Sequence, residues 1–410
     1  MYSPLVTIGL RVLLFPVDTG TKLAQCISFT IPYRMPPKLP AELNDAIIDH
    51  LHNDKASLAT CALVCKGWVP ASRHHLFRSV VIDPMHVAAF ISLVQSPLST
   101  IPGHISHFGM QDIRNLDKIL ILCLNCLHSV TSLCLMNFQW RLLEPATVAL
   151  TQSTFGAVAE LAFQSVNFNH FDQFAYFMSG FPRLQKLVVR QLSWKVETHT
   201  LFDRWIPPAT LRVLDLDLCP LADIMGCMRT HLPVPPIHTV HFRGLTTRWL
   251  FGVRDFLHAL GSSLEHLSLT YHFSDSDQLL SVSELCQHFD LSHNLSLRTI
   301  DLEMNLHQLF LPLSPLVKAT PQLLSQITSS TMEEVSFRIL VHRSSDLLSM
   351  DWDSLDRVFT QSQFARLKWI HISLGCCVDE DTARGWVNTI STKLPSCHSR
   401  CILHTTVLGV

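Results

Sequence analysis

The sequence predicts an α/β protein in which a short three-helix module precedes an irregular solenoid, with parallel strands inside and helices outside. Two observations lead to this prediction. Apolar residues recur with helical spacing in three short segments before residue 83. From Phe77 onward, a short apolar pattern typical of a strand returns eleven times, with helical spacing between its copies. We expect a leader at residues 1–34, the helical module at 35–82 and the solenoid at 83–410.

The composition excludes several classes of protein. The chain has 410 residues, too many for one ordinary compact core. Hydrophobic residues make up 48% and charged residues 16%, a balance that favours extensive burial over disorder. The formal net charge of −2 gives no overall field that would recruit nucleic acid or an anionic membrane, so neither is expected as a partner.

The first residues are apolar but do not resemble a membrane span. The run at residues 4–17 contains Arg11 and Pro16 and is too short to cross a bilayer. No basic segment precedes it and no small-residue cleavage site follows, so a secretory signal is the less favoured alternative. We interpret residues 1–34 as a poorly ordered leader or a gene-model extension, with Met35 as an alternative start.

The cysteines indicate a reducing compartment. There are 13, an odd number without regular spacing. Several lie inside apolar runs, and we interpret them as reduced core residues rather than a secreted disulfide framework. A cytoplasmic or nuclear location follows from this interpretation. The cysteines in such runs include Cys61, Cys65, Cys123, Cys126 and Cys134.

The first helix of the module is predicted from residue 40 onward. Pro40 suits a first helical turn, where its missing N–H is not needed. Leu43, Ile47 and Leu51 then recur every four residues, and Ile48 widens the apolar stripe.

Two further short helices follow. Asp54 is the expected N-cap of the second, with Ser57 as an alternative, and Leu58 lies on its apolar face. Gly67 allows a break before a third helical segment that begins at Trp68. Three helices in fewer than 50 residues bury little area. From spacing alone, the module is either an N-terminal cap for the solenoid or a docking module.

The same residues resemble a known motif. Leu39-Pro40-Ala41-Glu42-Leu43, then Leu63-Val64-Cys65-Lys66 with Trp68, then Arg73 with Leu76-Phe77 follow the order and spacing of the F-box, especially its variant in mushroom-type fungi. The resemblance implies that residues 39–77 bind the Skp adaptor of a cullin–RING ubiquitin ligase through apolar helices. It assigns adaptor binding to Leu39, Pro40, Leu43, Ile47, Ile48, Leu51, Leu58, Val64, Cys65 and Trp68.

The solenoid is predicted from a repeated pattern of three apolar residues. Two residues separate the first apolar position from the second, and one residue separates the second from the third. The last two apolar positions point to the same face of a short strand. Successive copies begin 25 to 28 residues apart up to Leu264 and 33 to 35 apart thereafter. The copies are Phe77/Val80/Ile82, Ile105/Phe108/Met110, Val130/Leu133/Leu135, Val158/Leu161/Phe163, Leu184/Leu187/Val189, Leu211/Leu214/Leu216, Ile237/Val240/Phe242, Leu264/Leu267/Leu269, Leu297/Ile300/Leu302, Met332/Val335/Phe337 and Leu367/Ile370/Ile372.

Helical stripes lie between these strands, which favours a parallel sheet with outer helices, curved into an arc. The stripes are Leu116/Ile119/Leu120/Leu124/Leu127, Phe171/Phe174/Phe177/Phe181, Val253/Phe256/Leu257/Leu260 and Trp386/Val387/Ile390/Leu394.

This pattern resembles divergent leucine-rich repeats, whose period is about 20–29 residues. The asparagine that such repeats place after the strand has candidates only at Asn137, Asn167 and Asn305, at no single offset. We therefore expect an irregular arc. The prolines within residues 294–341 predict an inserted loop there.

The residues that alternate with the buried pair of each strand form the expected recognition surface. A solvated sheet face that serves solubility alone is the alternative interpretation. An exposed Trp369 suits a binding anchor. The candidate substrate-binding residues are Arg190, Asp215, Asp217, His241, Arg243, Asp301, Glu303, Arg338, Trp369 and His371.

No catalytic or metal-binding motif is present. The sequence lacks a phosphate-binding glycine loop, a zinc-protease helix and a serine nucleophile elbow. Cys123-xx-Cys126 has no second pair, so a core role is favoured over a metal half-site. We expect a non-enzymatic protein without cofactor. The expected function is substrate recognition for an SCF-type ubiquitin ligase, and the alternative is a non-degradative repeat scaffold for protein–protein interaction.

Overall fold

The fold is described from a computed structural model of the chain. It covers residues 40–97, 99–112, 124–138, 140, 145–196, 205–230, 234–245, 250, 252–271, 281–305, 315–341, 343, 347–376 and 380–409. The expected leader and Leu39 lie outside these residues. The described chain divides into two compact units, the first up to residue 130 and the second from residue 131.

The first unit contains the three expected helices and a short parallel pair of strands. Strand β1 pairs with β2, with Ser79 opposite His107. The boundary expected at residue 82 therefore falls inside this unit, between two strands that hydrogen bond to each other. Its elements are α1 (Ala41–His50), α2 (Lys55–Val64), α3 (Val69–Phe77), β1 (Ser79–Ile82), α4 (Val87–Gln95) and β2 (His107–Gln111).

Local signals set the helix ends in this unit. The Asp54 carboxylate accepts a hydrogen bond from the Ser57 backbone N–H at 3.0 Å, which confirms Asp54 as the N-cap of α2. Helix α3 packs against both α1 and α2. His75 Nε2 lies 2.7 Å from Asp49 Oδ1 and so ties α3 to α1. Three short helices are thus held by a small core and a few polar contacts.

The second unit is built on a long parallel sheet. Its main sheet follows the order β3-β4-β6-β8-β9-β10-β11-β12-β13-β14, with every pair parallel. The strands are β3 (Ser132–Met136), β4 (Glu160–Gln164), β6 (Lys186–Arg190), β8 (Val213–Asp217), β9 (Thr239–Leu245), β10 (His266–Tyr271), β11 (Thr299–Asn305), β12 (Glu334–Leu340), β13 (Trp369–Cys376) and β14 (Leu403–Gly409).

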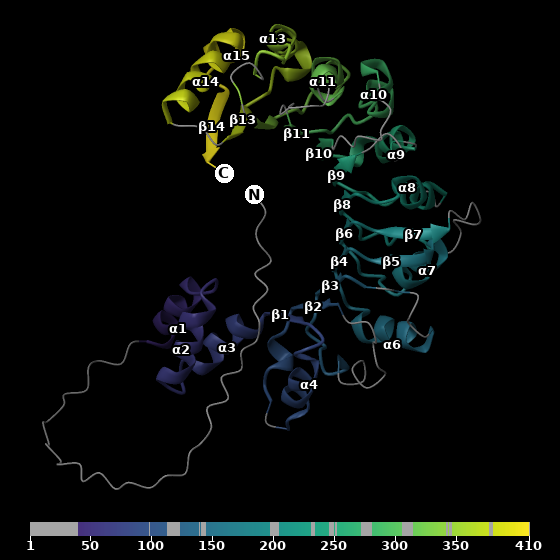
Figure 1. Ribbon diagram of the computed structural model, residues 1–410, viewed down its shortest axis with the longest axis vertical. Coiled ribbons are helices and arrows are strands. Elements are labelled where there is room, and N and C mark those ends of the chain that lie inside the picture. Colours follow the sequence, from purple (N-terminus) through teal and green to yellow (C-terminus); the bar gives the residue numbers. More distant parts are fainter. Residues whose placement is uncertain are drawn as a thin grey trace, which may run out of the picture. The chain divides into compact units, whose positions relative to one another are not determined.

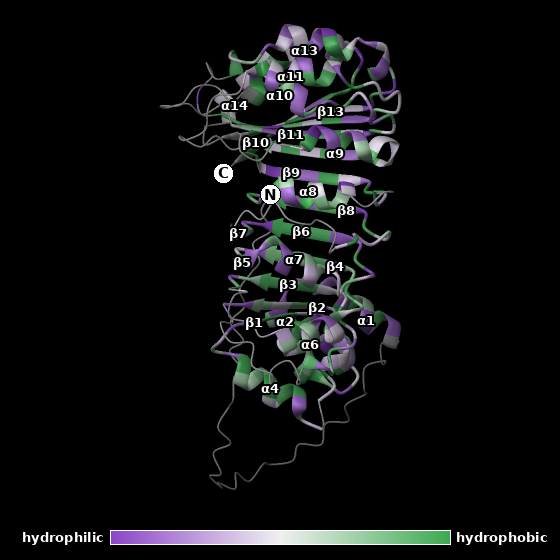
Figure 2. Ribbon diagram, turned by 90° about the vertical axis from the view of Figure 1, so that its right-hand side faces the viewer, coloured by the Kyte–Doolittle hydropathy of each residue, from purple (hydrophilic) through white to green (hydrophobic). Residues whose placement is uncertain are grey.

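Helices cover one face of this sheet. Within the second unit the row of strands is curved, with the helices along its outer side (Figure 1). Helices α11 and α13 alternate between hydrophilic and hydrophobic residues, as expected for helices with one buried face (Figure 2). The helices are α6 (Pro145–Phe155), α7 (Phe171–Met178), α8 (Leu221–Thr230), α9 (Val253–Leu260), α10 (Val282–His288), α11 (Pro315–Ser325), α13 (Trp352–Phe359), α14 (Glu380–Lys393) and α15 (Pro395–Ser399).

The strand prediction is confirmed in all eleven copies. In each, the second and third apolar positions lie in a strand and are buried, as Leu214 and Leu216 are in β8. The first apolar position is also buried in every copy except the first, where Phe77 ends α3 half-exposed. Alternation along the strand thus puts one set of side chains under the helices and leaves the other set on the opposite face.

The turn after the strand repeats one backbone conformation. Asn137, Ser165, Gln191, Leu218 and Gly244 each stand two residues after the third apolar position and have φ of 55°, 53°, 52°, 45° and 60°. The backbone N–H of Asn137 donates to the next repeat at Gln164, and this pattern continues along the row. The consistent feature is therefore the left-handed turn, and asparagine is one of several residues that occupy it.

Some expectations for the second unit were wrong. The expected loop within residues 294–341 contains helix α11. Pro315 begins it, where no backbone N–H is needed, and buried Leu316 and Leu323 offset the cost of the internal Pro321. Strand β14 and helix α15 were not expected. Neither was a second, two-stranded parallel sheet of β5 (Asn167–His170) and β7 (Ser193–Val196).

None of the cysteines whose side chains the structure describes forms a disulfide, but not all are core residues. Cys61 is buried as expected, whereas Cys65 is exposed just past the end of α2. Burial raises the pKa of the Cys134 and Cys286 thiols to about 11, so both are protonated at neutral pH. Cys123 lies outside the described residues.

Candidate functional site

Large apolar side chains are exposed on the helices of the first unit. Leu43 and Ile47 on α1 are 51% and 45% exposed, and Leu63 and Val64 at the end of α2 are 87% and 60% exposed. We call these four residues the helical surface. Exposed leucine, isoleucine and valine on two helices of one small unit are suited to contacts with an apolar partner.

The other residues expected to bind an adaptor divide between surface and core. Pro40 and Cys65 are exposed, and Leu51 and Trp68 are half-buried. Ile48 and Leu58 are fully buried and form the core of the helical module. Direct contact of Ile48 and Leu58 with a partner does not fit this burial; they hold the helices together instead. Leu63 was not among the expected contact residues, although it lies in the quoted motif.

The second unit presents the face of its sheet that the helices do not cover, here called the open face. In register, neighbouring strands place Asp215, His241, Ser268, Asp301 and Ser336 in one row. His371 and His404 continue this row on β13 and β14. The expected substrate-binding residues therefore lie on the open face, in two groups.

The first group lies on β6, β8 and β9. Asp215 is almost fully buried between Arg190 and Arg243, with Asp215 Oδ1 3.2 Å from Arg243 Nε and Asp215 Oδ2 3.7 Å from Arg190 Nη2. Asp217 stands in register between the same two arginines. Burial lowers the pKa of His241, and Asp215 opposes that shift. These opposite charges are matched within the group, which indicates an ion-pair network that orders this part of the face.

The second group lies on β11, β12, β13 and β14. Arg338 Nη1 donates to Glu303 Oε2 at 3.1 Å. Trp369 is 44% exposed, and its ring centroid lies 4.6 Å from that of His404. His371 Nε2 lies 3.7 Å from Glu334 Oε1. An aromatic side chain, imidazoles and carboxylates thus meet on adjacent strands.

Asp301 has the clearest electrostatic perturbation in the second group. Asp301 is exposed on the open face, and the protein atoms packed around it partly desolvate its carboxyl group. This desolvation raises the pKa of Asp301, and the negative charge of Glu334 adds to the effect. A raised native pKa means that the folded state binds the proton more tightly than the unfolded state does. The charged Asp301 therefore destabilises the fold at neutral pH.

We expect Asp301→Asn to raise the melting temperature at pH 7. The gain should shrink as the pH falls through the raised pKa and disappear below the ordinary value of 3.8, where both states carry the proton. Thermal unfolding of both proteins between pH 3 and pH 8 measures this. Asp353→Asn, on the exposed part of α13, is the control and should change little. A lower melting temperature for Asp301→Asn at pH 7 would contradict the assignment.

His404 and Glu334 belong to the second group but were not among the expected binding residues. The alternation of Glu334 with Val335 predicts its position on the open face. His404 was missed because β14 was not predicted. The run Thr405-Thr406-Val407, rich in β-branched residues, was the available signal for that strand.

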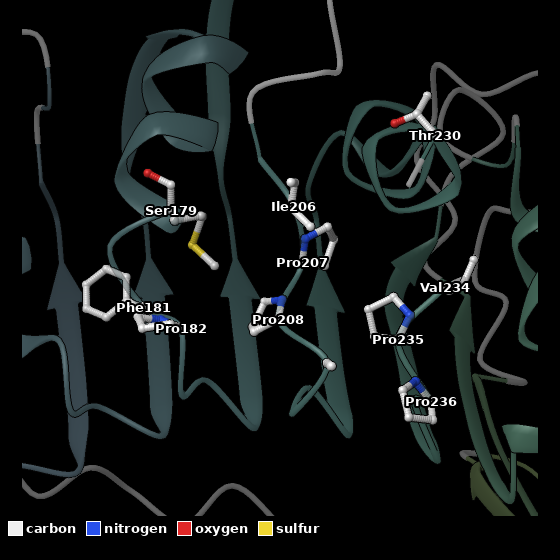
Figure 3. A pocket seen from close by; sticks show the side chains of 12 residues that line it. Ser179, Phe181, Pro182, Ile206, Pro207, Pro208, Thr230, Val234, Pro235 and Pro236 are labelled. Atoms are coloured by element: carbon white, nitrogen blue, oxygen red, sulfur yellow. The ribbon is translucent and has the colours of Figure 1, made fainter. Parts of the chain in front are cut away.

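A separate apolar hollow of about 680 Å³ lies at the ends of α7 and α8 (Figure 3). Prolines dominate its lining, and its polar side chains are two hydroxyls from Ser179 and Thr230. Such a lining offers no acid, base or strong nucleophile. The prolines are Pro182, Pro207, Pro208, Pro235 and Pro236.

The described residues hold neither a candidate metal site nor a candidate membrane span. No group of three or more His, Cys, Asp or Glu residues there is placed to hold a metal ion. Within the same part of the chain, each helix is too short or too polar to cross a membrane.

Comparison with known proteins does not show which family the chain belongs to. No family model and no curated protein matches the chain. Among solved structures, a crystal structure of a protein from Bacteroides fragilis is similar, with 8% sequence identity and a TM-score of 0.32. The match covers 77% of this chain and 68% of that chain. A similarity of this size carries no argument about function.

Proposed function

We propose that this chain is the substrate-recognition subunit of an SCF-type cullin–RING ubiquitin ligase. The helical surface of the first unit binds the Skp adaptor, and the open face of the second unit binds a protein substrate. The chain itself catalyses nothing; it raises the local concentration of its target beside a ubiquitin-charged enzyme. Such a role places the protein in the cytoplasm or nucleus.

One observation carries the proposal: the module keeps a formed core while large apolar side chains stay exposed. Ile48 and Leu58 already fill the interior, so the fold of the module does not need Leu43, Ile47, Leu63 or Val64 to be buried. Burying a leucine or isoleucine that is about half exposed contributes about 1–1.5 kcal/mol. These residues fall within the segment that resembles the F-box.

We expect the double substitution Leu43→Ala with Ile47→Ala to weaken adaptor binding by about 30- to 150-fold. The reason is the loss of about 2–3 kcal/mol of apolar burial at the interface. Purified full-length protein titrated with a Skp adaptor by isothermal calorimetry measures this. Both residues are exposed, so circular dichroism should show an unchanged fold.

The matched control is Ile206→Ala with Leu348→Ala, which removes two exposed apolar side chains from the second unit. This variant should bind the adaptor as the parent protein does. Equal affinity of the Leu43/Ile47 variant and the parent would refute the docking role. Adaptor binding without cullin-dependent turnover of any bound protein in cells would instead favour the non-degradative scaffold.

A further inference from the structure

The open face carries an unbalanced charge at its C-terminal end. The described open-face positions of β10 to β14 carry three carboxylates, which belong to Asp301, Glu303 and Glu334. Among lysines and arginines, the same positions carry Arg338 alone. Three carboxylates against one guanidinium leave a net charge of −2, histidines aside. Arg338 is already paired with Glu303 at 3.1 Å. At the described open-face positions, no lysine or arginine forms an ion pair with Asp301 or Glu334, although Arg338 lies near enough to Asp301 to attract its charge.

The charge balance differs on β6, β8 and β9. There Lys186, Arg190 and Arg243 stand against Asp215 and Asp217, a net charge of +1. The excess of negative charge is thus confined to one end of the open face. A face that served solubility alone would not require positive and negative charges to be separated between its two ends.

Trp369 stands directly beside Glu334, one of the two unbalanced carboxylates. It is in register with Glu334 on the neighbouring strand, and Asp301 lies one strand further on, opposite Ser336. Trp369 stays 44% exposed although its ring contacts His404. An exposed indole next to carboxylates is suited to a cation, which the ring quadrupole and the negative charges both attract.

Glu334 keeps acceptor capacity for a ligand. It accepts one hydrogen bond from Ser336 Oγ at 3.1 Å, and the 3.7 Å to His371 is longer than a hydrogen bond. A carboxylate offers about four acceptor sites on its two oxygens. Asp301 is held where its charge destabilises the fold, a cost typical of residues retained for binding.

We propose that Trp369, Glu334 and Asp301 bind an arginine side chain of an extended segment in a protein partner. This inference rests on the proposed function, since it names the kind of substrate segment that the open face takes. The guanidinium stacks on the indole and donates to the two carboxylates in a planar arrangement that an ammonium group cannot reproduce. The negative end of the face disfavours a phosphorylated or acidic segment.

The test uses full-length protein and fluorescein-labelled Gly-Ser peptides with arginine at alternate positions. The same peptides with citrulline, lysine or glutamate in place of arginine are compared by fluorescence anisotropy at low salt. We expect the arginine peptide to bind at least about tenfold more tightly than the citrulline and lysine peptides, with the glutamate peptide weakest. Glu334→Gln and Trp369→Ala should each weaken arginine-peptide binding at least about fivefold.

Asp353→Asn removes the same formal charge from α13 and is the matched control, expected to leave affinity within about twofold. Equal weakening by Glu334→Gln and Asp353→Asn would mean non-specific attraction and overturn the inference. So would citrulline or lysine peptides that bind as well as arginine, or an arginine peptide that does not bind. Titration of the same protein with the adaptor distinguishes failure of this inference from failure of the proposed function. If the adaptor binds but the protein shows no preference for arginine peptides, this inference is refuted and the adaptor-binding role is not.

Discussion

Replacing Phe174 by alanine is expected to lower the free energy of unfolding by about 3–5 kcal/mol. Phe174 is fully buried on α7 and lies at the centre of an aromatic cluster. Its ring centroid is 5.8 Å from that of Phe163, 5.7 Å from Phe168 and 5.8 Å from Trp205. Because large rings enclose the site on several sides, the cavity left by alanine should not collapse fully.

Urea denaturation followed by circular dichroism measures this loss. The control is Tyr176→Ala, two residues along the same helix, where the side chain is exposed. That change should cost less than about 1 kcal/mol. If Phe174→Ala cost no more than the control, the cluster would not be the packed core that joins α7 to the sheet.

Gly244→Ala is expected to cost about 2–4 kcal/mol. Gly244 has φ of +60°, which costs a residue with a Cβ about 1–2 kcal/mol. A Cβ there would also lie 2.6 Å from Leu218 Cγ and 2.7 Å from Asp217 Oδ1. The rest of the expected loss comes from this overlap between neighbouring turns, of the order seen for overpacking.

Two further variants separate strain from overlap. Gly252 lies in the left-handed helical region, with φ of +86° and ψ of −8°, but a Cβ there would meet no atom within 4 Å. Gly252→Ala should therefore show the conformational cost alone. In a Leu218→Ala background, the cost of Gly244→Ala should fall toward that of Gly252→Ala. A double-mutant cycle with no coupling between positions 218 and 244 would refute the close approach of the two turns.

Much of the fold could be predicted from the spacing of apolar residues. In β8, Leu214 and Leu216 are separated by one residue and both face the helices, because side chains alternate along a strand. The left-handed turns could not be predicted, because residues as different as Gln191 and Leu218 occupy them. The sheet imposes this conformation through backbone hydrogen bonds, which leave little trace in side-chain identity.

The candidate site was predicted in part. Alternation placed Asp215, Asp301 and Trp369 on the open face, because strand geometry fixes the side of the sheet. It did not reveal that Asp215 lies between two arginines whereas Asp301 forms no ion pair with an arginine, since that depends on which strands are neighbours. On the helices, a period of about four residues grouped Ile47 and Ile48 in one stripe, and their difference in burial came from the packing of α3 against α1.

By itself, the sequence determined the strand–helix alternation, the three N-terminal helices and the set of side chains on each face of the sheet. These features follow from local periodicity, which adjacent residues encode directly. Only the tertiary structure decided the register that aligns His371 with His404, the pairing of Arg338 with Glu303, and the exposure of Leu43 beside a buried core. Each of these depends on contacts between segments far apart in the chain or on how separate helices pack, and residue spacing does not encode either.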